Sequence, residues 1–372
     1  MKTLSAPHSR PLILVCLALA LFAAGRANTA RGDSAAAGNG FFAVTVEDER
    51  GGAGLGAFTV TTGPDHPLGE GAPLLFAGEG DQPEAGGSYL SVRSYTTGTD
   101  YVQTLDGPAS GNPVVSLDEW GDVAELAGDG YRASYDLPGG DQLADSLRIV
   151  SDVAVSGSGA GSAVEFAATV TNTGDYPLLI GVRYLFDVDL AGDDGPVLQR
   201  PGPVPEEGSE AAYSPALYTV QLRGSGAAPL DVYFYARPDG DSPPPDRLTF
   251  AHWPEASQAA FDYDPRGREV ASEGGLNDSA LLYYFGATPE SALSLQPGTS
   301  ATVSVSMRGS APAGAEFCGN GSDDDGDALA DAADPDCGQE SPTPSPAPAP
   351  AGAPPFPVEL PRTGGRPAVA RN

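Results

Sequence analysis

The stretch LLIGVRYLF, residues 178–186, decides the fold of this chain. Apolar side chains occupy both of its alternating faces almost throughout, and Arg183 is the one charged interruption. Successive side chains of a strand point to opposite faces of a sheet, so a strand that is apolar on both faces must be covered on both. The stretch therefore predicts a central strand buried inside a larger sheet structure.

Runs with the two-residue period of half-buried strands surround this stretch in the sequence. Residues 163–170 carry apolar side chains at every second position, and residues 302–307 do so while serines occupy the positions between. Gly, Pro, Asp and Ser clusters separate the runs, and residues 41–308 contain no convincing helix. Earlier strand-like runs cover residues 41–46, 58–61, 89–95, 101–105 and 131–137.

This pattern predicts an all-β chain with roughly fifteen strands over some 270 residues. Such a set of strands makes either one large antiparallel β-sandwich or two smaller ones, and we favour a single sandwich over residues 41–310. The glycine-rich stretch 51–56 opens no helix, so we interpret it as a loop.

Several short motifs in the second half of the sandwich region resemble those of a known fold. They are VTN at 170–172 with Gly174, GVRYLFD at 181–187, DDG at 193–195, FAHWP at 250–254, DSALLYY at 278–284 and LQPG at 295–298. The segment 147–308 that contains them resembles the C-terminal half of a large β-sandwich of secreted bacterial proteins, similar in outline to the galactose-mutarotase-like supersandwich. The resemblance implies a fold and no activity, because sandwiches of this shape host binding and catalysis alike.

Two groups of residues in the sandwich could carry chemistry. Four aspartates at 187, 189, 193 and 194 follow the central strand, where they could hold a cation or simply cap turns; we favour the turns. His252 and Trp253 could form a sugar-facing patch, although a tryptophan packed into the sandwich with histidine at its rim is the commoner arrangement.

Motifs of the common hydrolases, metalloproteases and nucleotide-binding enzymes do not occur in the sequence. There is no Gly-x-Ser-x-Gly, no His-Glu-x-x-His and no phosphate-binding loop. A glycosidase needs only two carboxylates, and 50 acidic residues nominate no particular pair. The sequence therefore favours a protein that is not an enzyme, and it leaves an enzymatic activity open.

The N-terminus predicts a secreted protein, and the overall charge disfavours two classes of partner. Residues 1–27 combine a basic start, an apolar run too short to span a bilayer and small residues at a cleavage site, so we expect a secretory signal followed by a flexible stretch, residues 28–40. The net charge of −31 makes nucleic acid and anionic membranes poor partners. We expect no transmembrane segment in the mature, secreted chain.

Residues 316–338 contain seven aspartates between Asp323 and Asp336 and no basic residue, so a divalent cation is needed to offset their repulsion. The spacing of a calcium loop assigns the ligands Asp323, Asp325, Asp327, the carbonyl of Leu329, Asp331 and Asp334. The stretch resembles the aspartate-rich calcium loops of secreted bacterial proteins and of thrombospondin type 3 repeats. Ala328 replaces the usual glycine and Asp334 the usual glutamate, which predicts a dissociation constant for Ca²⁺ of roughly 10⁻⁴ to 10⁻³ M. A solvated acidic spacer is the alternative.

Cys318 and Cys337 bracket this loop and are the only cysteines outside the leader. In an oxidising compartment they should pair, and closing a loop of about twenty residues would contribute roughly 3 kcal/mol. We therefore expect a disulfide-closed, calcium-binding module at the end of the sandwich.

The tail beyond this module reads as a stalk with a sorting signal. Residues 339–359 are rich in proline, which favours a disordered, extended polyproline-type segment. Leu360, Pro361, Arg362, Thr363 and Gly364 match the Leu-Pro-x-Thr-Gly motif through which sortases link proteins to cell-wall peptidoglycan. No apolar retention segment follows the motif, so wall anchoring and simple release both stay open.

The leading hypothesis is a secreted or cell-surface, non-enzymatic β-sandwich protein that binds calcium structurally through the Asp-rich loop. The alternative is an extracellular protein that binds or acts on carbohydrate, with a glycan as ligand of the sandwich face.

Overall fold

The computed structural model describes residues 35–309, except residue 53 and residues 79–86, 105–109, 127–128, 141–142, 200–208, 215, 217–218, 225–229, 237–241 and 271–276. The predicted signal sequence, calcium loop, disulfide, stalk and sorting motif all lie outside these residues. They remain predictions: the ligands Asp323, Asp325, Asp327, Leu329, Asp331 and Asp334, the cysteines Cys318 and Cys337, and the motif Leu360 to Gly364.

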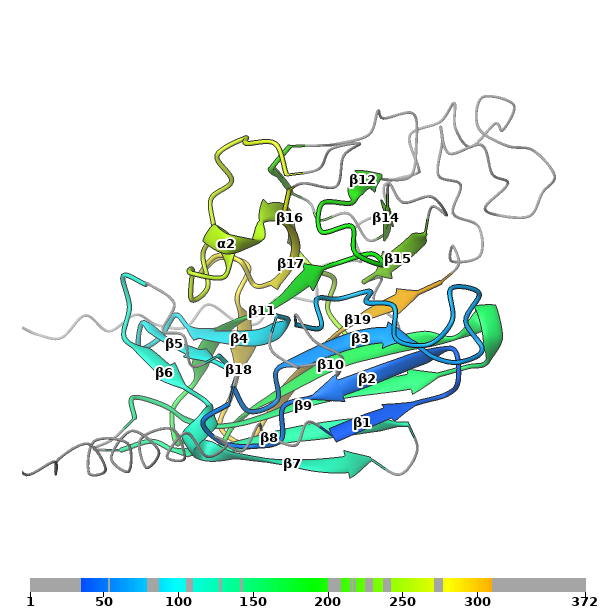
Figure 1. Ribbon diagram of the computed structural model, residues 1–372. Helices are drawn as coiled ribbons and strands as arrows, with labels where there is room; N and C mark the ends of the chain where they lie inside the picture. The colour runs from blue at the N-terminus through cyan, green and yellow to red at the C-terminus, as the bar shows by residue number, and fades with distance from the viewer. Residues whose placement is uncertain are drawn as a thin grey trace, which may run out of the picture.

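The described residues fold into two large sheets and one small sheet, as the sequence predicted for an all-β sandwich (Figure 1). We call the first large sheet the long-strand sheet. Its strands, in spatial order, are β12 (Val197–Gln199), β14 (Thr219–Arg223), β15 (Asp231–Tyr235), β19 (Ser300–Arg308), β10 (Ala163–Asn172), β9 (Ser146–Ser156), β8 (Gly130–Pro138) and β7 (Gly121–Leu126).

The second large sheet is called the site sheet, because the candidate site lies at its edge. Its strands, in spatial order, are β13 (Ala211–Tyr213), β16 (Arg247–His252), β17 (Ser279–Phe285), β11 (Leu178–Val188), β4 (Tyr89–Ser94), β5 (Thr99–Val102) and β6 (Val114–Ser116); β18 (Leu293–Leu295) also pairs with β11. Neighbouring strands are antiparallel throughout, except β5 and β6, which pair in parallel.

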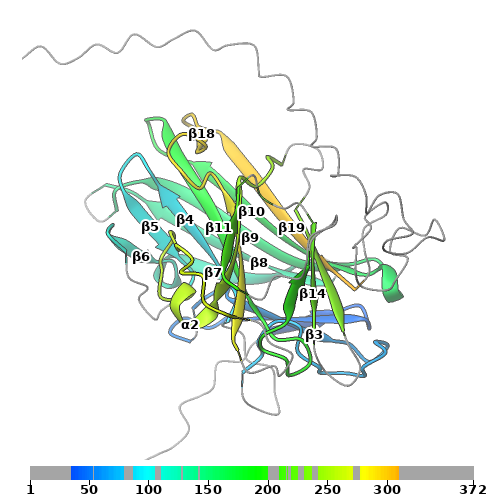
Figure 2. The same ribbon diagram turned by 90° about the horizontal axis from the view of Figure 1, so that it is seen from above.

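The small sheet contains β1 (Ala35–Gly38), β2 (Phe42–Val46) and β3 (Phe58–Thr62). It packs beside β8 and β9 of the long-strand sheet (Figures 1 and 2). The expected boundary at residue 41 is therefore too late: Ala35 to Gly38, assigned to a flexible N-terminus, pair with Val46 to Ala43. Three alanines and a glycine show no alternation of polar and apolar residues, so the local sequence does not predict this strand.

The stretch predicted as a central strand is β11, which lies between β17 and β4. Its partners cover both edges, and its side chains are buried on both faces from Ile180 to Val188. The apolar faces predicted for residues 163–170 and 302–307 are also confirmed, since the alternating residues of β10 and β19 are buried.

One aromatic cluster joins all three sheets and explains why they form a single core. Phe58 of β3 stacks on Phe166 of β10 at 5.0 Å between ring centroids, and Phe166 contacts Phe186 of β11 at 4.9 Å. All three rings are fully buried. Because buried aromatic side chains carry the largest apolar areas, this cluster contributes strongly to the free energy of folding.

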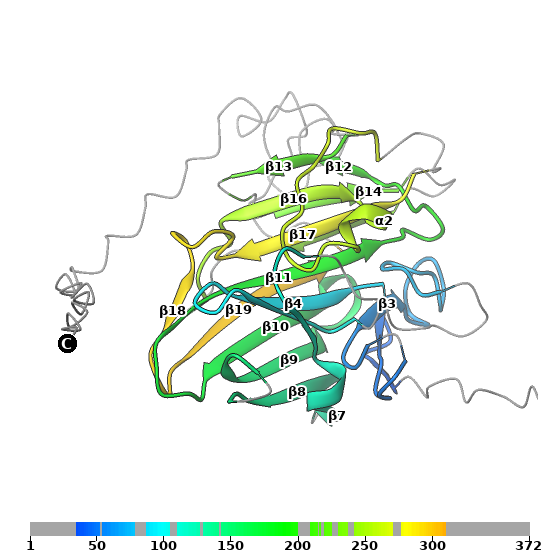
Figure 3. The same cartoon turned by 90° about the vertical axis from the view of Figure 1, so that its left-hand side faces the viewer.

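The opposite, outer face of the site sheet is covered by the chain that follows β16. This segment starts with the short helix α2 (Trp253–Ala256) and runs to Tyr263, and Figure 3 shows α2 over β17. Buried Arg183 of β11 anchors it by donating to the carbonyl oxygens of Ala259 (2.8 Å) and Phe261 (3.1 Å). The other helices in the part of the chain that the structure describes are the 3-10 turns η1 (Asp118–Trp120) and η2 (Gly159–Gly161).

No helix within the described residues has the length and apolar character required to span a membrane.

Candidate functional site

Three strand ends meet at one edge of the site sheet and bring distant residues together. Strand β11 ends at Val188, which pairs with Ser279 at the start of β17, and Ser279 also pairs with His252 at the end of β16. The residues next to these ends, Trp253 and Asp278, are joined by a backbone hydrogen bond of 3.1 Å from the Trp253 N–H to the Asp278 carbonyl.

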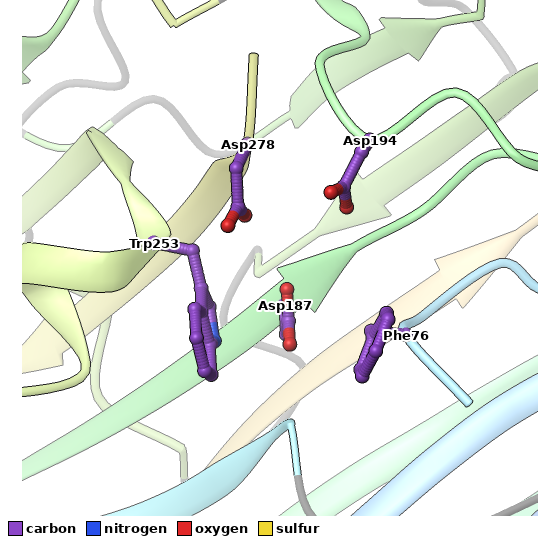
Figure 4. Close-up of a pocket in the computed structure, with 5 residues that line it drawn as sticks. All are labelled: Phe76, Asp187, Asp194, Trp253 and Asp278. Atoms are coloured by element: carbon purple, nitrogen blue, oxygen red, sulfur yellow. The ribbon is translucent and has the colours of Figure 1, made fainter. Parts of the chain in front are cut away.

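Three carboxylates converge at this edge. One oxygen from each of Asp187, Asp194 and Asp278 can be chosen so that all lie within 4.8 Å of one another, and Figure 4 shows the side chains turned toward a common space. We call these residues the aspartate triad. Asp187 belongs to β11 and Asp278 precedes β17, whereas Asp194 lies on the loop after β11 and is fixed by the hydrogen bond from Ser279 N–H to its carbonyl oxygen (2.8 Å).

The triad lines a small pocket together with two aromatic residues, Phe76 and Trp253 (Figure 4). The indole N–H of Trp253 points to the carbonyl oxygen of Gly87 at 3.4 Å. The pocket has a volume of about 50 Å³, which admits an ion or a few water molecules. A cavity that encloses an organic ligand is several times larger, so a sugar ring does not fit inside.

All three triad carboxyl groups have raised pKa values. Burial, followed by the charges of Asp278 and Asp194, holds the pKa of Asp187 well above its ordinary value. Burial and the neighbouring carboxylates Asp189 and Asp193 raise the pKa of Asp194 to about 6. Burial and the charge of Asp194 raise the pKa of Asp278 to about 7, although His252 opposes this change. Three carboxylates of the same sign in a half-buried pocket therefore resist full ionisation.

None of the three carboxylate groups has a hydrogen-bond donor or an ion-pair partner among the described residues. Asp187 is only 2 % exposed. One side-chain oxygen of Asp194 and one of Asp278 are buried and have no hydrogen-bond partner among the residues that the structure describes. Buried polar atoms in native proteins are nearly always satisfied, so three unpaired carboxylates at one place require an explanation.

The four aspartates that follow the central strand turn out to have two different roles. Asp189 accepts a hydrogen bond from the N–H of Gly192 (2.7 Å), and Asp193 accepts one from Gly195 (3.2 Å), so these two cap turns as the favoured interpretation predicted. The other two, Asp187 and Asp194, join Asp278 instead. The sequence reasoning missed Asp278 and Phe76; Asp278 had one usable signal, its place directly before a strand-like run.

A second carboxylate group beside the triad has the opposite character. Glu210 accepts hydrogen bonds from Tyr263 and from the N–H groups of His252 (3.0 Å) and Arg266 (2.9 Å), and it pairs with Arg268 at 3.3 Å. Burial acts to raise the pKa of Glu210, but these contacts outweigh it and hold the pKa below its ordinary value. Because Arg268 and His252 also contact Glu255, the His252 ring is engaged in this network, while Trp253 reaches the pocket.

The sequence matches no protein-family model and no curated protein. Among solved structures, a provisionally assigned aldose 1-epimerase from Escherichia coli K12 is similar with 12% identity and a TM-score of 0.44, covering 74% of this chain and 98% of its own. A galactose mutarotase-like protein from Lactobacillus casei ATCC 334 has 13% identity and a TM-score of 0.41, and the match covers 74% of this chain and 99% of that protein. An aldose epimerase homologue from C. elegans has 11% identity and a TM-score of 0.41, and the match covers 74% of this chain and 98% of that protein.

Proposed function

We propose that this chain is an extracellular carbohydrate-binding protein whose sandwich contacts a glycan at the Trp253 edge of the site sheet. The observation that carries the proposal is the half-buried indole of Trp253 next to three carboxylates with unused acceptor positions. Sugar rings present apolar C–H faces that pack on aromatic rings, and hydroxyl groups that donate to carboxylates. At identities of 11 to 13% and TM-scores below 0.5, the solved structures above lend this chain no activity.

The size of the pocket favours binding over hydrolysis. A glycosidase holds the scissile bond between its two carboxyl groups, so the sugar ring must fit between them. A volume of about 50 Å³ has no room for a ring between the members of the triad. A glycan would therefore rest on the indole and extend only hydroxyl groups into the pocket.

Two further proposals concern the parts of the chain that flank the sandwich. We propose that residues 316–338 form a disulfide-closed calcium loop that stiffens the junction with the tail, and that the leader directs the protein out of the cell. The ligand spacing, the two cysteines and the leader composition support these proposals. Cell-wall fractions of the native host, probed for the protein, decide between anchoring through residues 360–364 and release.

The glycan proposal is tested by retention on a panel of insoluble polysaccharides. We expect the full chain to be retained on at least one of them, and Trp253→Ala to abolish this retention. Trp120→Ala is the matched control, because Trp120 packs against the core at η1 and does not line the pocket. Absence of retention across the panel, or equal loss in both variants with unchanged melting curves, would refute the proposal.

A further inference from the structure

We propose that Asp187, Asp194 and Asp278 form a calcium site that is distinct from the Asp-rich loop of residues 316–338. The aspartate triad supplies only oxygen ligands, and Ca²⁺ takes six to eight of these, with water completing the shell. Three observations support the inference: the spacing of the triad oxygens, the unpaired state of the carboxylates and the hydrogen bonds that fix the backbone around them.

The spacing of the triad oxygens suits calcium. The chosen oxygens lie within 4.8 Å of one another. Three evenly spaced oxygens bound to one Ca²⁺ at about 2.3 to 2.6 Å are up to about 4.5 Å apart, so a shift of a few tenths of an ångström at most lets one ion contact all three carboxylates. Ca²⁺ also tolerates irregular arrangements, whereas Mg²⁺ requires a nearly ideal octahedron. No cysteine belongs to the triad and His252 contacts Glu255, which disfavours the softer transition metals.

The unpaired state of the triad indicates that a cation is the missing partner. Asp187 is 2 % exposed, and its carboxylate receives no hydrogen bond or ion pair from any residue that the structure describes. The nearby Arg268 is engaged by Glu210 and Glu255. A buried carboxylate without a donor is costly, and a divalent cation removes this cost for all three groups at once.

The backbone around the triad is fixed while its carboxylates are free. Hydrogen bonds hold the main chain of Asp194 through Ser279 and that of Asp278 through Trp253. A Cβ atom at Gly87 would collide with the carboxylate of Asp187, so only glycine leaves this carboxylate its place in the pocket. Such support outside the ligands is what keeps a metal site in its binding geometry.

A bound Ca²⁺ would also explain how so small a pocket recognises a large ligand; this consequence rests on the proposed glycan function. Three carboxylates leave positions on the ion open, and either water or a pair of sugar hydroxyl groups can fill them. The glycan would then be held by the ion and by the face of Trp253. Calcium binding itself requires no glycan, so the two proposals fail separately.

Terbium luminescence tests the site directly, because Tb³⁺ replaces Ca²⁺ and emits when a nearby indole is excited. The full mature chain is titrated with Tb³⁺ and then with Ca²⁺ as competitor. The variants are Asp187→Asn, the milder Asp194→Asn on the loop, and Trp253→Phe, with Trp120→Phe as matched control. Asp325→Asn combined with Asp327→Asn disables the predicted loop.

We expect indole-sensitised emission that Ca²⁺ displaces, that falls at least tenfold in Asp187→Asn, Asp194→Asn and Trp253→Phe, and that persists in Trp120→Phe and in the loop variant. Melting curves confirm that each variant is folded. Emission that survives both aspartate substitutions, that disappears only in the loop variant, or that never exceeds free Tb³⁺ would overturn the inference. Polysaccharide retention with and without EDTA then tests the glycan step alone.

Discussion

Replacing Asp278 by Asn should stabilise the metal-free protein at neutral pH and leave it unchanged at acidic pH. Burial and the charge of Asp194 raise the pKa of Asp278 from 3.8 to about 7, against the effect of His252. A carboxyl group with a raised pKa keeps its proton in the folded state while the unfolded chain loses it. Its contribution to stability is therefore complete below pH 4 and is lost as the pH rises toward 7. Asn cannot ionise and does not suffer this loss.

The size of the effect follows from the two pKa values. Each pH unit between them corresponds to about 1.4 kcal/mol, so the interval from 3.8 to about 7 gives an upper bound of about 4 kcal/mol. Because Asp278 is only partly buried, solvent screening reduces this to about 1 to 2 kcal/mol. For a domain of this size that corresponds to a rise in Tm of about 3 to 6 °C. The sign is diagnostic, since most substitutions destabilise by about 1 kcal/mol.

Thermal and urea unfolding of the wild type and of Asp278→Asn, each in EDTA between pH 4 and pH 8, measures the effect. Asp175→Asn is the control, because this aspartate is exposed on the turn between β10 and β11. Excess Ca²⁺ at pH 8 should then stabilise the wild type more than the variant, by about 3 kcal/mol at a hundredfold excess over Kd. A variant that loses equal stability at pH 4 and pH 8 would show that Asp278 has only a packing role.

Three other predictions concern the scaffold. Arg183→Met should lower the free energy of unfolding by about 2 to 4 kcal/mol and expose the segment after α2 to proteolysis, because it removes the donors to Ala259 and Phe261; unchanged urea curves would contradict this. Phe166→Ala should cost about 3 to 5 kcal/mol in urea unfolding, since the ring joins three sheets, and a loss below 1 kcal/mol would argue against one shared core. Glu210→Gln should cost about 1 to 3 kcal/mol at pH 7. The difference in unfolding free energy between the wild type and Glu210→Gln should disappear as the pH falls below the ordinary carboxyl range, because the pKa of Glu210 is lowered in the folded state. A difference that does not change with pH would refute this prediction.

The sequence predicted the fold class well because sandwich strands carry their own signals. Strand β11 was recognisable as central from its apolar character on both faces, and β10 and β19 from their alternation. The short strand β1 was not recognisable, since four small residues show no period. Its formation depends on pairing with β2, and the local sequence pattern does not predict that pairing.

The candidate site was only half predictable for a similar reason. Asp187 and Asp194 stand out as part of an acidic group after a buried strand, but Asp278 lies far along the chain. Only the register of β11 on β17, in which Val188 pairs with Ser279, places Asp278 beside them. The same register through β16 brings Trp253 to the pocket. The site therefore follows from strand pairing, and a sequence without a known register cannot nominate its members.

The two carboxylate groups at this edge support a ligand-binding role for the triad when they are compared. Glu210 is also buried at this edge and is fully satisfied by Tyr263, Arg268 and two backbone N–H groups. This chain can thus neutralise a buried carboxylate with its own donors, and it does so at His252, the residue before Trp253 of the pocket. The described residues offer the triad no such donor, and burial together with neighbouring carboxylates raises the pKa of each of its members. Sequences that specify one fold satisfy their buried polar groups except at functional sites, where stability is exchanged for a place to bind. A cation bound at the triad would bring it to the same satisfied state as Glu210, and the pH-dependent stability of Asp278→Asn with and without Ca²⁺ measures that difference directly.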